Sequence, residues 1–484
     1  MTIKDLKPAL VFSIFDKINQ VPRPSKKEEK IRQFLLDFAA ENNIEAVCDA
    51  IGNIVMRKPA TPGKENAPTV VLQSHMDMVC ESNDKTFDFN TQPIKTIVDG
   101  EWLRADGTTL GADNGIGMAA SLAVMVDKSL VHGPVEALFT VDEETGLTGA
   151  NNLGENMIKG TILLNLDSED DAEIFVGCAG GVDTTCHFTY KQTEAPADYH
   201  YFKLDVSGLL GGHSGGDIHL GRANANKLLT RFLYAVGLKH EYALCEIDGG
   251  NLRNAIPRAA HAVFGVEKAN KEEIRVMFNK YVADVEKEYA GLEEGLKLTL
   301  DSVDRPAFAI DKKTATALVK SVYSAPHGVI SMSRDLEGLV ETSTNLASIK
   351  MQDDKHIVVT TSQRSSVESR KWDIAYQVES HFLLAGAKVT HGDGYPGWAP
   401  NLNSTIMHIT SEAYEELYGI KPAIKAIHAG LECGLFLQKY PYLDMVSIGP
   451  TLRDVHSPSE RMHIPAVERF WGQLTRTLEK VAKL

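Results

Sequence analysis

Three short, mostly apolar runs early in the chain are each followed within two residues by a histidine or an acidic residue. The runs cover residues 69–73, 135–141 and 161–166. Apolar runs of this length predict buried strands. The carboxyl ends of parallel strands meet at one edge of a sheet, and open α/β sheets bind ligands there. The pattern therefore predicts an α/β fold with a mostly parallel sheet, and a site at the edge where these strands end.

The first run leads into a histidine and an aspartate two residues apart, His75 and Asp77. Alternate residues of an extended segment point the same way, so the two side chains share a face. A carboxylate that holds one imidazole nitrogen leaves the other nitrogen for a metal ion. The pair by itself also fits a hydrogen-bonded surface pair. The residues that follow favour the metal site.

Further oxygen and nitrogen ligands follow at later strand ends. Asp113 lies in the glycine-rich segment 110–117, at the start of a predicted apolar helix, where a carboxylate can bridge two cations. The remaining candidates are Glu143 and Glu144 after the second run, Asp167 after the third, and His456 in the loop 454–458. Five such groups at successive strand ends predict a site for two metal ions.

The motifs that carry these residues resemble those of a known family. They are S-H-M-D-M-V-C at 74–80, L-G-A-D-N-G at 110–115, D-E-E-T-G at 142–146, N-L-D at 165–167, G-G-H-S-G at 211–215 and H-A-G-L-E at 428–432. In content and order they are similar to the aminoacylase, carboxypeptidase and carnosinase superfamily of co-catalytic zinc peptidases, and within it to the bacterial aminoacyl-histidine dipeptidases. The resemblance covers nearly the whole chain.

The resemblance implies two divalent metal ions per subunit. It assigns His75, Asp113 and Asp167 to one ion and Asp113, Glu144 and His456 to the other, so that Asp113 bridges them. Ligand sets rich in oxygen, with one histidine per ion, suit zinc, and they also suit manganese or cobalt. Zinc is the expected metal, and the other two are alternatives.

The resemblance also makes Glu143 the general base and Asp77 the partner that orients His75. Adjacent glutamates at a strand end cannot both point at one metal ion without a backbone bulge. Glu144 is therefore expected to bind the metal, whereas Glu143 takes a proton from water and later gives it to the leaving amine.

The implied reaction is hydrolysis of unblocked dipeptides with a free carboxyl terminus, in particular Xaa-His dipeptides including carnosine-like β-alanyl compounds. An N-acyl amino acid deacylase is the main alternative, because it needs the same metals and base. A broader aminopeptidase or tripeptidase on the same scaffold is another. A catalytically silent metal-binding protein would retain the ligands and lose the base, and the presence of Glu143 and Asp77 argues against it.

The chain is too long for one ordinary core, and the predicted elements suggest where it divides. Strands and helices alternate over residues 1–181, whereas residues 182–391 contain strand pairs with longer helices. His456 requires residues 392–484 to return to the first domain. We therefore expect a catalytic domain built from 1–181 and 392–484, interrupted by an α+β domain. The resemblance makes the insertion a lid and dimerisation domain, and we interpret it as two related halves in one sheet.

The inserted domain contains the expected substrate-binding residues. The segment G-G-H-S-G-G at 211–216 lacks the Lys-Ser/Thr of a phosphate loop, so its glycines are better read as letting His213 project toward the reacting carbonyl. In similar enzymes this histidine stabilises the oxyanion, often from the partner subunit, and Asn254 helps. Arg364 could clamp a substrate carboxylate, aided by the backbone N–H of Gly430, or form an ordinary strand-end salt bridge. Four other histidines are expected to be structural or at the surface, namely His219, His391, His408 and His428, although His428 is close enough in sequence to Gly430 to line the pocket.

Charge and cysteine usage exclude several partners. The net charge of -15 argues against nucleic acid and against anionic membranes. Residues 9–15 are too short to span a bilayer and are expected to form an amphipathic helix instead of a signal peptide. Six scattered cysteines without a C-x-x-C pair predict reduced thiols. We expect a cytoplasmic enzyme that binds a small dipeptide, binds neither nucleic acid nor membrane, and forms a homodimer through the lid domain.

Overall fold

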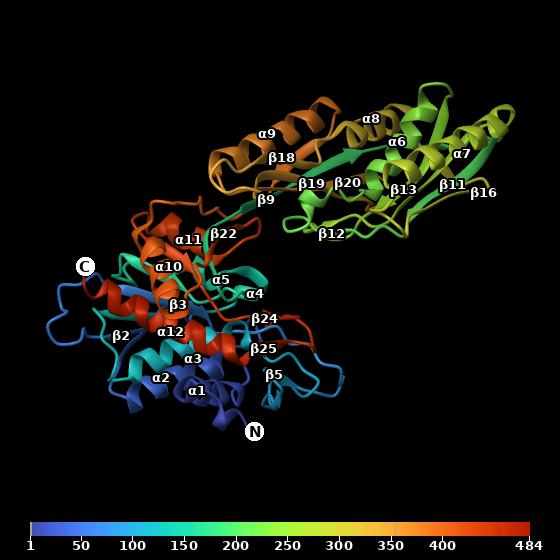
Figure 1. The fold of residues 1–484 in the computed structure, drawn as a ribbon. Coiled ribbons are helices and arrows are strands. Elements are labelled where there is room, and N and C mark those ends of the chain that lie inside the picture. Colours follow the sequence, from blue (N-terminus) through green and yellow to red (C-terminus); the bar gives the residue numbers. More distant parts are fainter. Residues whose placement is uncertain (1, 354) are drawn as a thin grey trace. The chain divides into compact units, whose positions relative to one another are not determined.

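The computed structural model describes residues 2–353 and 355–484, and the chain divides into two compact units. Unit 1 comprises Met1–Cys178, Trp398–Ala426 and Leu431–Leu484, and unit 2 comprises Ala179–Gly397 and Ile427–Gly430. Figure 1 shows the first and last α-helices, α1 (Ala9–Asn19) and α12 (Ile464–Val481), in the same unit. The long insertion therefore runs from 179 to 397, against the expected 182 to 391. The second, short insertion at 427–430 has no counterpart among the sequence-based expectations.

The main sheet of unit 1 has eight strands in the order β1-β2-β6-β3-β7-β23-β8-β22. In that order they are Glu45–Cys48, Ile54–Lys58, Val135–Thr140, Val70–His75, Ile162–Asn165, Asp444–Ser447, Glu173–Cys178 and Ala423–Ile427. The neighbours β6-β3, β3-β7 and β7-β23 are parallel, whereas β1-β2, β2-β6 and β23-β8 are antiparallel. The predicted α/β class is confirmed, and the parallel part of the sheet is its centre.

The centre of this sheet is covered on both faces, since β3, β6 and β7 are buried along their whole lengths. Apolar helix faces supply the cover: α3 packs against β3 and α1, and α10 packs against β23 and α12. The helices of unit 1 other than α1 and α12 are α2 (Glu29–Glu41), α3 (Ala112–Val126), α4 (Glu143–Gly146), α5 (Thr148–Asn151), α10 (Thr405–Tyr418), α11 (Glu432–Lys439) and the 3-10 turn η1 (Ile3–Asp5).

A second, four-stranded antiparallel sheet in unit 1 joins segments far apart in the sequence. Its order is β24-β25-β5-β4, formed by Leu452–Arg453, Arg461–His463, Trp102–Ala105 and Thr96–Asp99. Register pairs β25 directly with β5, with Arg461 opposite Arg104. This sheet holds the loop that carries His456 against the part of the chain that precedes Asp113.

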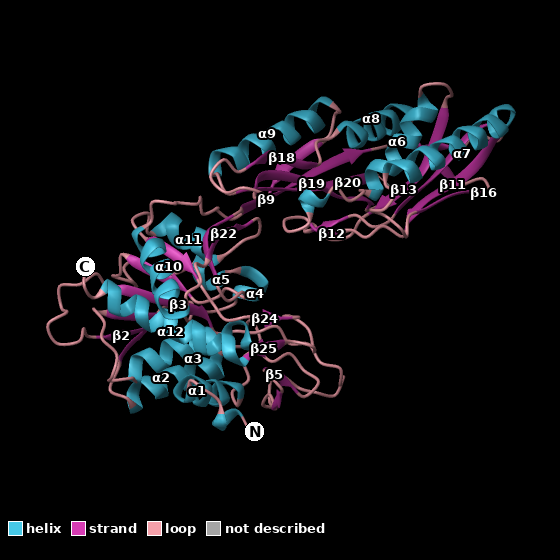
Figure 2. Cartoon of the chain, viewed as in Figure 1, coloured by secondary structure: helices cyan, strands magenta, loops and turns pink. Residues whose placement is uncertain are grey.

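Unit 2 is built on one nine-stranded antiparallel sheet with its α-helices in a layer on one face (Figure 2). The strand order is β16-β11-β15-β13-β19-β20-β9-β21, with β18 paired to β19. In that order the strands are Lys297–Val303, Tyr199–Ser207, Ala260–Glu267, Tyr242–Gly249, Val340–Met351, His356–Ser365, Gly180–Thr189, Lys388–His391 and, for β18, Gly328–Met332. The α-helices are α6 (Ala225–Gly237), α7 (Lys271–Glu288), α8 (Lys312–Ser324) and α9 (Glu368–Leu384).

The sheet of unit 2 is symmetric in its topology. The elements β11-α6-β13-β15-α7-β16 form one β-α-β-β-α-β half, and β9 with α8-β19-β20-α9-β21 forms another. Each half orders its four strands in the same way, and the halves meet where β13 pairs with β19. The helices α6 and α8 pack against each other at this junction. The arrangement agrees with the interpretation of two related halves.

Short elements complete unit 2. The strands β10 (Gln192–Glu194) and β17 (Phe308–Ile310) pair with each other, as do β12 (Gly212–His213) and β14 (Ala255–Ile256). The 3-10 turns are η2 (Ile218–Leu220) and η3 (Lys268–Asn270). Among the helices of the described residues, none combines the length and the apolar character that crossing a membrane requires.

Candidate metal centre and substrate-binding residues

The central parallel strands of unit 1 bring the predicted ligands to one edge of the sheet. His75 is the last residue of β3, and Asp167 follows β7 by two residues. Glu143 and Glu144 begin α4, directly after β6. Because β6, β3 and β7 are neighbours, their carboxyl ends are adjacent. His456 reaches the same place from the loop between β24 and β25.

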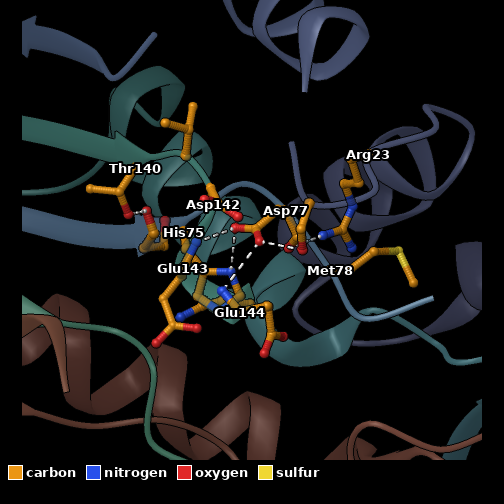
Figure 3. A network of polar contacts seen from close by, with 12 residues as sticks. Arg23, His75, Asp77, Met78, Thr140, Asp142, Glu143 and Glu144 are labelled. Carbon is orange, nitrogen blue, oxygen red and sulfur yellow. Dashed lines mark hydrogen bonds and ion pairs between the residues drawn. The ribbon is translucent and has the colours of Figure 1, made fainter. Parts of the chain in front are cut away.

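His75 is buried, and Figure 3 shows it beside Asp77. Its Nδ1 lies 3.3 Å from Oδ1 of Asp77. Its Nε2 lies 3.0 Å from Oδ1 of Asp113 and 3.4 Å from Oδ1 of Asp167. One nitrogen therefore faces the predicted orienting carboxylate, and the other faces two predicted ligands.

Asp113 lies between the two histidines. Its Oδ1 faces His75, whereas its Oδ2 lies 3.1 Å from Nε2 of His456. The same nitrogen of His456 lies 3.0 Å from Oε2 of Glu144. Ligand atoms of His75, Asp113 and Glu144 all lie within 4.8 Å of one another. All five predicted ligands thus form one cluster, and each oxygen of Asp113 faces a different half of it, as a bridging ligand would.

The electrostatics of this cluster favour positive charge. Burial opposes protonation of His75, but the charge of Asp167 and hydrogen bonds to the surrounding carboxylates raise its pKa well above the usual value. Hydrogen bonds to Asp113 and Glu144 raise the pKa of His456 to about 11. Burial raises the pKa of Asp167 to about 6. Several carboxylates in a small volume destabilise one another unless cations neutralise them.

The donor set fits a pair of divalent ions. It consists of three carboxylates and two imidazoles, a mixture that suits zinc, manganese or cobalt. One further atom lacks a partner: Oε1 of Glu144 is buried and accepts no hydrogen bond from the described residues. A metal ion would satisfy it. The identity of the metal stays a prediction.

Asp77 has partners besides His75. Its Oδ1 also accepts a hydrogen bond from the backbone N–H of Glu143 at 3.1 Å, and its Oδ2 accepts one from that of Glu144 at 3.3 Å. Ser25 donates to Oδ2 at 2.7 Å. One buried carboxylate therefore fixes both the histidine and the start of α4, which the sequence pattern alone did not indicate.

The two neighbouring glutamates have different surroundings. Glu144 contacts His456 and its side chain is only 4% exposed. Within the described chain, no hydrogen bond or ion pair engages the carboxylate of Glu143, and in Figure 3 the two side chains diverge from α4. Burial raises the pKa of Glu143 well above the usual value, and the charge of Asp167 adds to the effect.

Two other buried charged residues of the site were not assigned a role from the sequence. Glu432, in the H-A-G-L-E motif, accepts hydrogen bonds from Gln73 at 2.6 Å and Thr140 at 2.9 Å. Burial raises its pKa to about 8. Arg23 donates to the backbone carbonyl of Asp77 at 3.0 Å and to that of Gly111 at 2.6 Å, which ties together the two ligand loops. For Arg23 the only sequence signal is its place between two prolines.

Unit 2 buries Arg364 without an acidic partner. Its Nη1 donates to the hydroxyl of Tyr395 at 2.7 Å and its Nε donates to Ser214 at 3.3 Å. The residue is 7% exposed, and no carboxylate pairs with it in the described part of the chain. The alternative of an ordinary strand-end salt bridge is therefore not what this arginine forms. A buried guanidinium with unused donors can accept an anionic ligand.

His213 is the last residue of β12, and Asn254 directly precedes its pairing partner Ala255. Its Nδ1 accepts hydrogen bonds from the backbone N–H groups of Gly215 at 3.2 Å and Gly216 at 3.0 Å. Burial and the charge of Arg364 lower its pKa. The neutral ring therefore carries its proton on Nε2, which leaves a hydrogen-bond donor. The carbonyl of Asn254 accepts from the N–H of Ser214 at 2.8 Å, while its side chain is exposed.

The inserted segment 427–430 joins the same cluster of unit 2. A side chain at Gly430 would meet the ring of Tyr395, with its Cβ 2.8 Å from the nearest ring carbon. His428, expected to be structural or at the surface, is buried and its Nε2 lies 2.7 Å from the hydroxyl of Ser343. Burial and the charge of Arg364 lower its pKa to about 3. The roles of Ser343 and Tyr395 were not indicated by the sequence.

The three other histidines named from the sequence lie in different surroundings, and His219 is near enough to His428 for its charge to lower the pKa of that ring. His219 and His408 are exposed, and His391 lies 2.9 Å from the hydroxyl of Thr184 and 3.3 Å from Glu379. The structure therefore brings the five predicted metal ligands, Asp77 and Glu143 together in unit 1. It brings His213, Asn254, Arg364 and Gly430 together in unit 2. The roles assigned to these residues stay predictions.

Comparisons with known proteins agree with this architecture. The chain is 44% identical over 480 residues to the cytosol non-specific dipeptidase of Escherichia coli strain K12, with 99% of each chain covered. It superposes on the crystal structure of aminoacylhistidine dipeptidase from Vibrio alginolyticus with a TM-score of 0.93 and 43% identity, over 99% of this chain and 98% of that one. A tripeptidase from Staphylococcus aureus shares the fold, with a TM-score of 0.58 and 15% identity over 99% and 100% of the two chains.

The model of the peptidase family M20/M25/M40 matches residues 71–480, which include every predicted metal ligand and every predicted substrate-binding residue. The match extends through unit 2 and covers the strands of the main sheet of unit 1 from residue 71 onward, leaving out β1 and β2. On these grounds the chain belongs to the peptidase family M20/M25/M40.

Proposed function

We propose that this protein is a metal-dependent dipeptidase that hydrolyses unblocked dipeptides with a free carboxyl terminus. The observation that carries the proposal is the placement of Asp113, whose two carboxylate oxygens face different histidines, His75 and His456. A carboxylate between two sets of nitrogen and oxygen donors is suited to bridging two cations. The E. coli relative described as a cytosol non-specific dipeptidase supports the choice of substrate class and a cytoplasmic location.

The residues of the chain divide the chemical work. Two divalent cations held by the five ligands, zinc in the first instance, would lower the pKa of a water molecule and polarise the substrate carbonyl. Glu143 takes the proton from the water and delivers it to the nitrogen of the leaving amine. Its unengaged carboxylate and raised pKa suit this exchange. Asp77 keeps Nδ1 of His75 occupied, so that Nε2 points at the cation.

The buried cluster of unit 2 is proposed to recognise the end of the substrate. Arg364 has donors for a terminal carboxylate, and the N–H of Gly430 adds another. His213 presents an Nε2–H donor that suits a developing oxyanion, with Asn254 beside it. The name of the Vibrio relative, aminoacylhistidine dipeptidase, supports Xaa-His substrates including carnosine-like ones.

A hydrolysis profile tests the proposal. The chelator-treated enzyme is given zinc, manganese or cobalt separately, and its activity is measured on Xaa-His dipeptides, other unblocked dipeptides, tripeptides and N-acetyl amino acids. We expect no turnover without metal, the fastest turnover on dipeptides, and a preference for histidine at the carboxyl terminus. Faster hydrolysis of N-acetyl amino acids would favour a deacylase and overturn the proposal. Equal rates on tripeptides would favour a broader aminopeptidase.

We further propose a homodimer, formed through unit 2, in which His213 serves the active site of the partner subunit. The support for this proposal comes from the immediate surroundings of His213. His213 lies on a short strand followed by a glycine turn, and its only hydrogen bonds to the ring leave Nε2 free within the described residues. Such a turn can extend a donor away from its own domain.

Subunit mixing tests this arrangement. Inactive His213→Ala and inactive Glu143→Ala subunits are combined under conditions of verified subunit exchange. A mixed dimer then contains one site with an intact base and an intact histidine from the neighbour, so activity is expected to return to that site. If exchange is verified and no activity returns, the histidine acts within its own chain or is not needed.

A further inference from the structure

Glu460 lies buried beneath the start of α3, the helix that carries Asp113. Its Oε2 accepts hydrogen bonds from the backbone N–H groups of Leu110 at 2.7 Å and Gly111 at 2.9 Å. Its Oε1 accepts from those of Ala112 at 2.8 Å and Asp113 at 3.3 Å. Leu110 and Gly111 precede α3, and Asp113 itself has non-helical backbone angles, so these N–H groups lack regular helical partners and this one carboxylate satisfies four of them.

The next residue, Arg461, holds a different ligand loop. Its Nε lies 3.2 Å from Oδ2 of Asp454, two residues before His456. Its guanidinium also lies over the ring of Trp102, 4.8 Å from the ring centre. Because Arg461 belongs to β25, paired with β5, its own backbone is fixed. The side chain thus connects a rigid strand to the loop that presents His456.

The loop that carries His456 has a backbone conformation that must be restrained by contacts from outside the loop. Asp454 and His456 have positive φ angles of 57° and 60°, a conformation that residues other than glycine adopt only where their surroundings impose it. Ser457 supplies one local restraint by donating to the carbonyl of Asp454 at 2.7 Å. The pair of Arg461 with Asp454 supplies a second restraint from outside the loop.

We propose that Glu460 and Arg461 are positioning residues of the metal centre. Glu460 fixes the helix start that presents the bridging carboxylate, and Arg461 fixes the loop that presents His456. Two consecutive residues would therefore set the spacing between Asp113 and His456, both ligands of the same ion. The inference rests on the proposed two-metal centre. It expects Glu460 to influence binding of both ions and Arg461 to influence chiefly one.

Metal titration of conservative variants tests this. In Glu460→Gln the amide nitrogen cannot accept hydrogen bonds, and in Arg461→Met the packing on Trp102 is kept while the charge is lost. We expect Glu460→Gln to weaken binding of both zinc equivalents and Arg461→Met to weaken one, each about 10- to 100-fold, the range typical of partners that orient metal ligands. Arg461→Lys should recover part of the affinity. Chelator competition gives the two dissociation constants.

Two matched controls separate positioning from general stability. Arg476 of α12 forms a comparable ion pair of 2.9 Å with Glu416 of α10, and neither residue belongs to a ligand loop. Glu136 is a buried carboxylate that accepts backbone N–H bonds from Lys159 and Gly160 at 2.7 and 3.0 Å. Arg476→Met and Glu136→Gln are expected to change at most the melting temperature and to leave both dissociation constants unchanged.

The outcomes are distinct for the two proposals. If the wild-type protein binds fewer than two ions, the two-metal centre itself is overturned. If it binds two ions, and Glu460→Gln and Arg461→Met bind both with unchanged constants, the positioning role is overturned and the two-metal centre stands. If the control variants weaken metal binding as much as the test variants, the effect is one of general stability and the positioning role also fails.

Discussion

The histidines of the candidate site in unit 1 and those beside Arg364 in unit 2 occupy environments of opposite charge. In unit 1, His75 and His456 face carboxylates, which raise the pKa of each ring. In unit 2, burial and the charge of the nearby Arg364 lower the pKa of His213 and His428. The carboxylates around His75 and His456 offer negative charge for a cation, whereas the arginine beside His213 and His428 keeps those two rings neutral. The contrast is the one that the proposed roles require, a metal centre in unit 1 and a site for a substrate carboxylate in unit 2.

The sharpest test of this contrast removes the carboxylate shared by both halves of the first cluster. Asp113→Ala is expected to weaken binding of both ions by more than the roughly 100-fold that loss of a ligand's hydrogen-bond partner costs, and to abolish turnover. His456→Ala should weaken chiefly one ion. Metal analysis and competition titration measure both. Near-native binding of two equivalents by Asp113→Ala would rule out the bridge.

The second prediction removes Glu143, the proposed general base, and leaves every proposed metal ligand in place. Glu143→Ala is expected to retain both ions and to lose about 10² to 10⁴ in kcat, because the residue moves a proton and does not bind metal. Glu144→Ala serves as the matched variant and should lose an ion. If Glu143→Ala loses an ion instead, the roles of the two neighbouring glutamates are exchanged.

The anion-binding character of unit 2 depends on Arg364. Charged hydrogen bonds contribute about 1.5 to 3 kcal/mol, so Arg364→Met should lower kcat/KM for dipeptides roughly 10- to 100-fold, mainly through KM. The change should be small for dipeptide amides, which lack the carboxylate. Arg253→Met removes an exposed ion pair of unit 2 and is the control. Equal decreases in kcat/KM for dipeptides and for their amides would show that Arg364 does not bind the substrate carboxylate.

The smallest expected effect concerns stability and pH. The pKa of His428 is about 3 in the folded chain and about 6.5 when unfolded, so the unfolded state binds more protons in between. Its contribution is present above pH 6.5 and lost as the pH falls, about 2 kcal/mol by pH 5. With metals bound, urea unfolding of the wild type should lose this much more stability than His428→Gln. Identical pH profiles would mean that His428 takes up a proton in place.

The sequence alone was enough to predict where a residue lies when its position follows from its own strand or turn. The spacing of His75 and Asp77, and the acidic residues after β6 and β7, follow from strand alternation and from the parallel sheet. The βα pattern and the insertion follow from the change in element pattern along the chain. These features are local, and the resemblance supplied their order.

What the sequence did not reveal depends on contacts between distant segments. Glu460 bonds to backbone groups about 350 positions earlier, and no residue pattern marks a carboxylate as the partner of a remote helix start. The strands β24 and β25 have only two and three residues, too few for an alternation of apolar and polar residues to be recognised. Tyr395 joins Arg364 only because β20 and the segment after β21 meet at β9.

The place of β23 in the main sheet has a consequence for synthesis of the chain on the ribosome. This strand pairs with β7 on one side and β8 on the other, yet it is made after the whole of unit 2. While the nascent chain grows, β7 therefore has no parallel neighbour on that side, and its open edge offers hydrogen bonds to any other strand. Unit 2 has all its long strands by residue 391 and can fold first. The catalytic sheet closes only as translation ends, which makes its early half the part that most needs protection from aggregation.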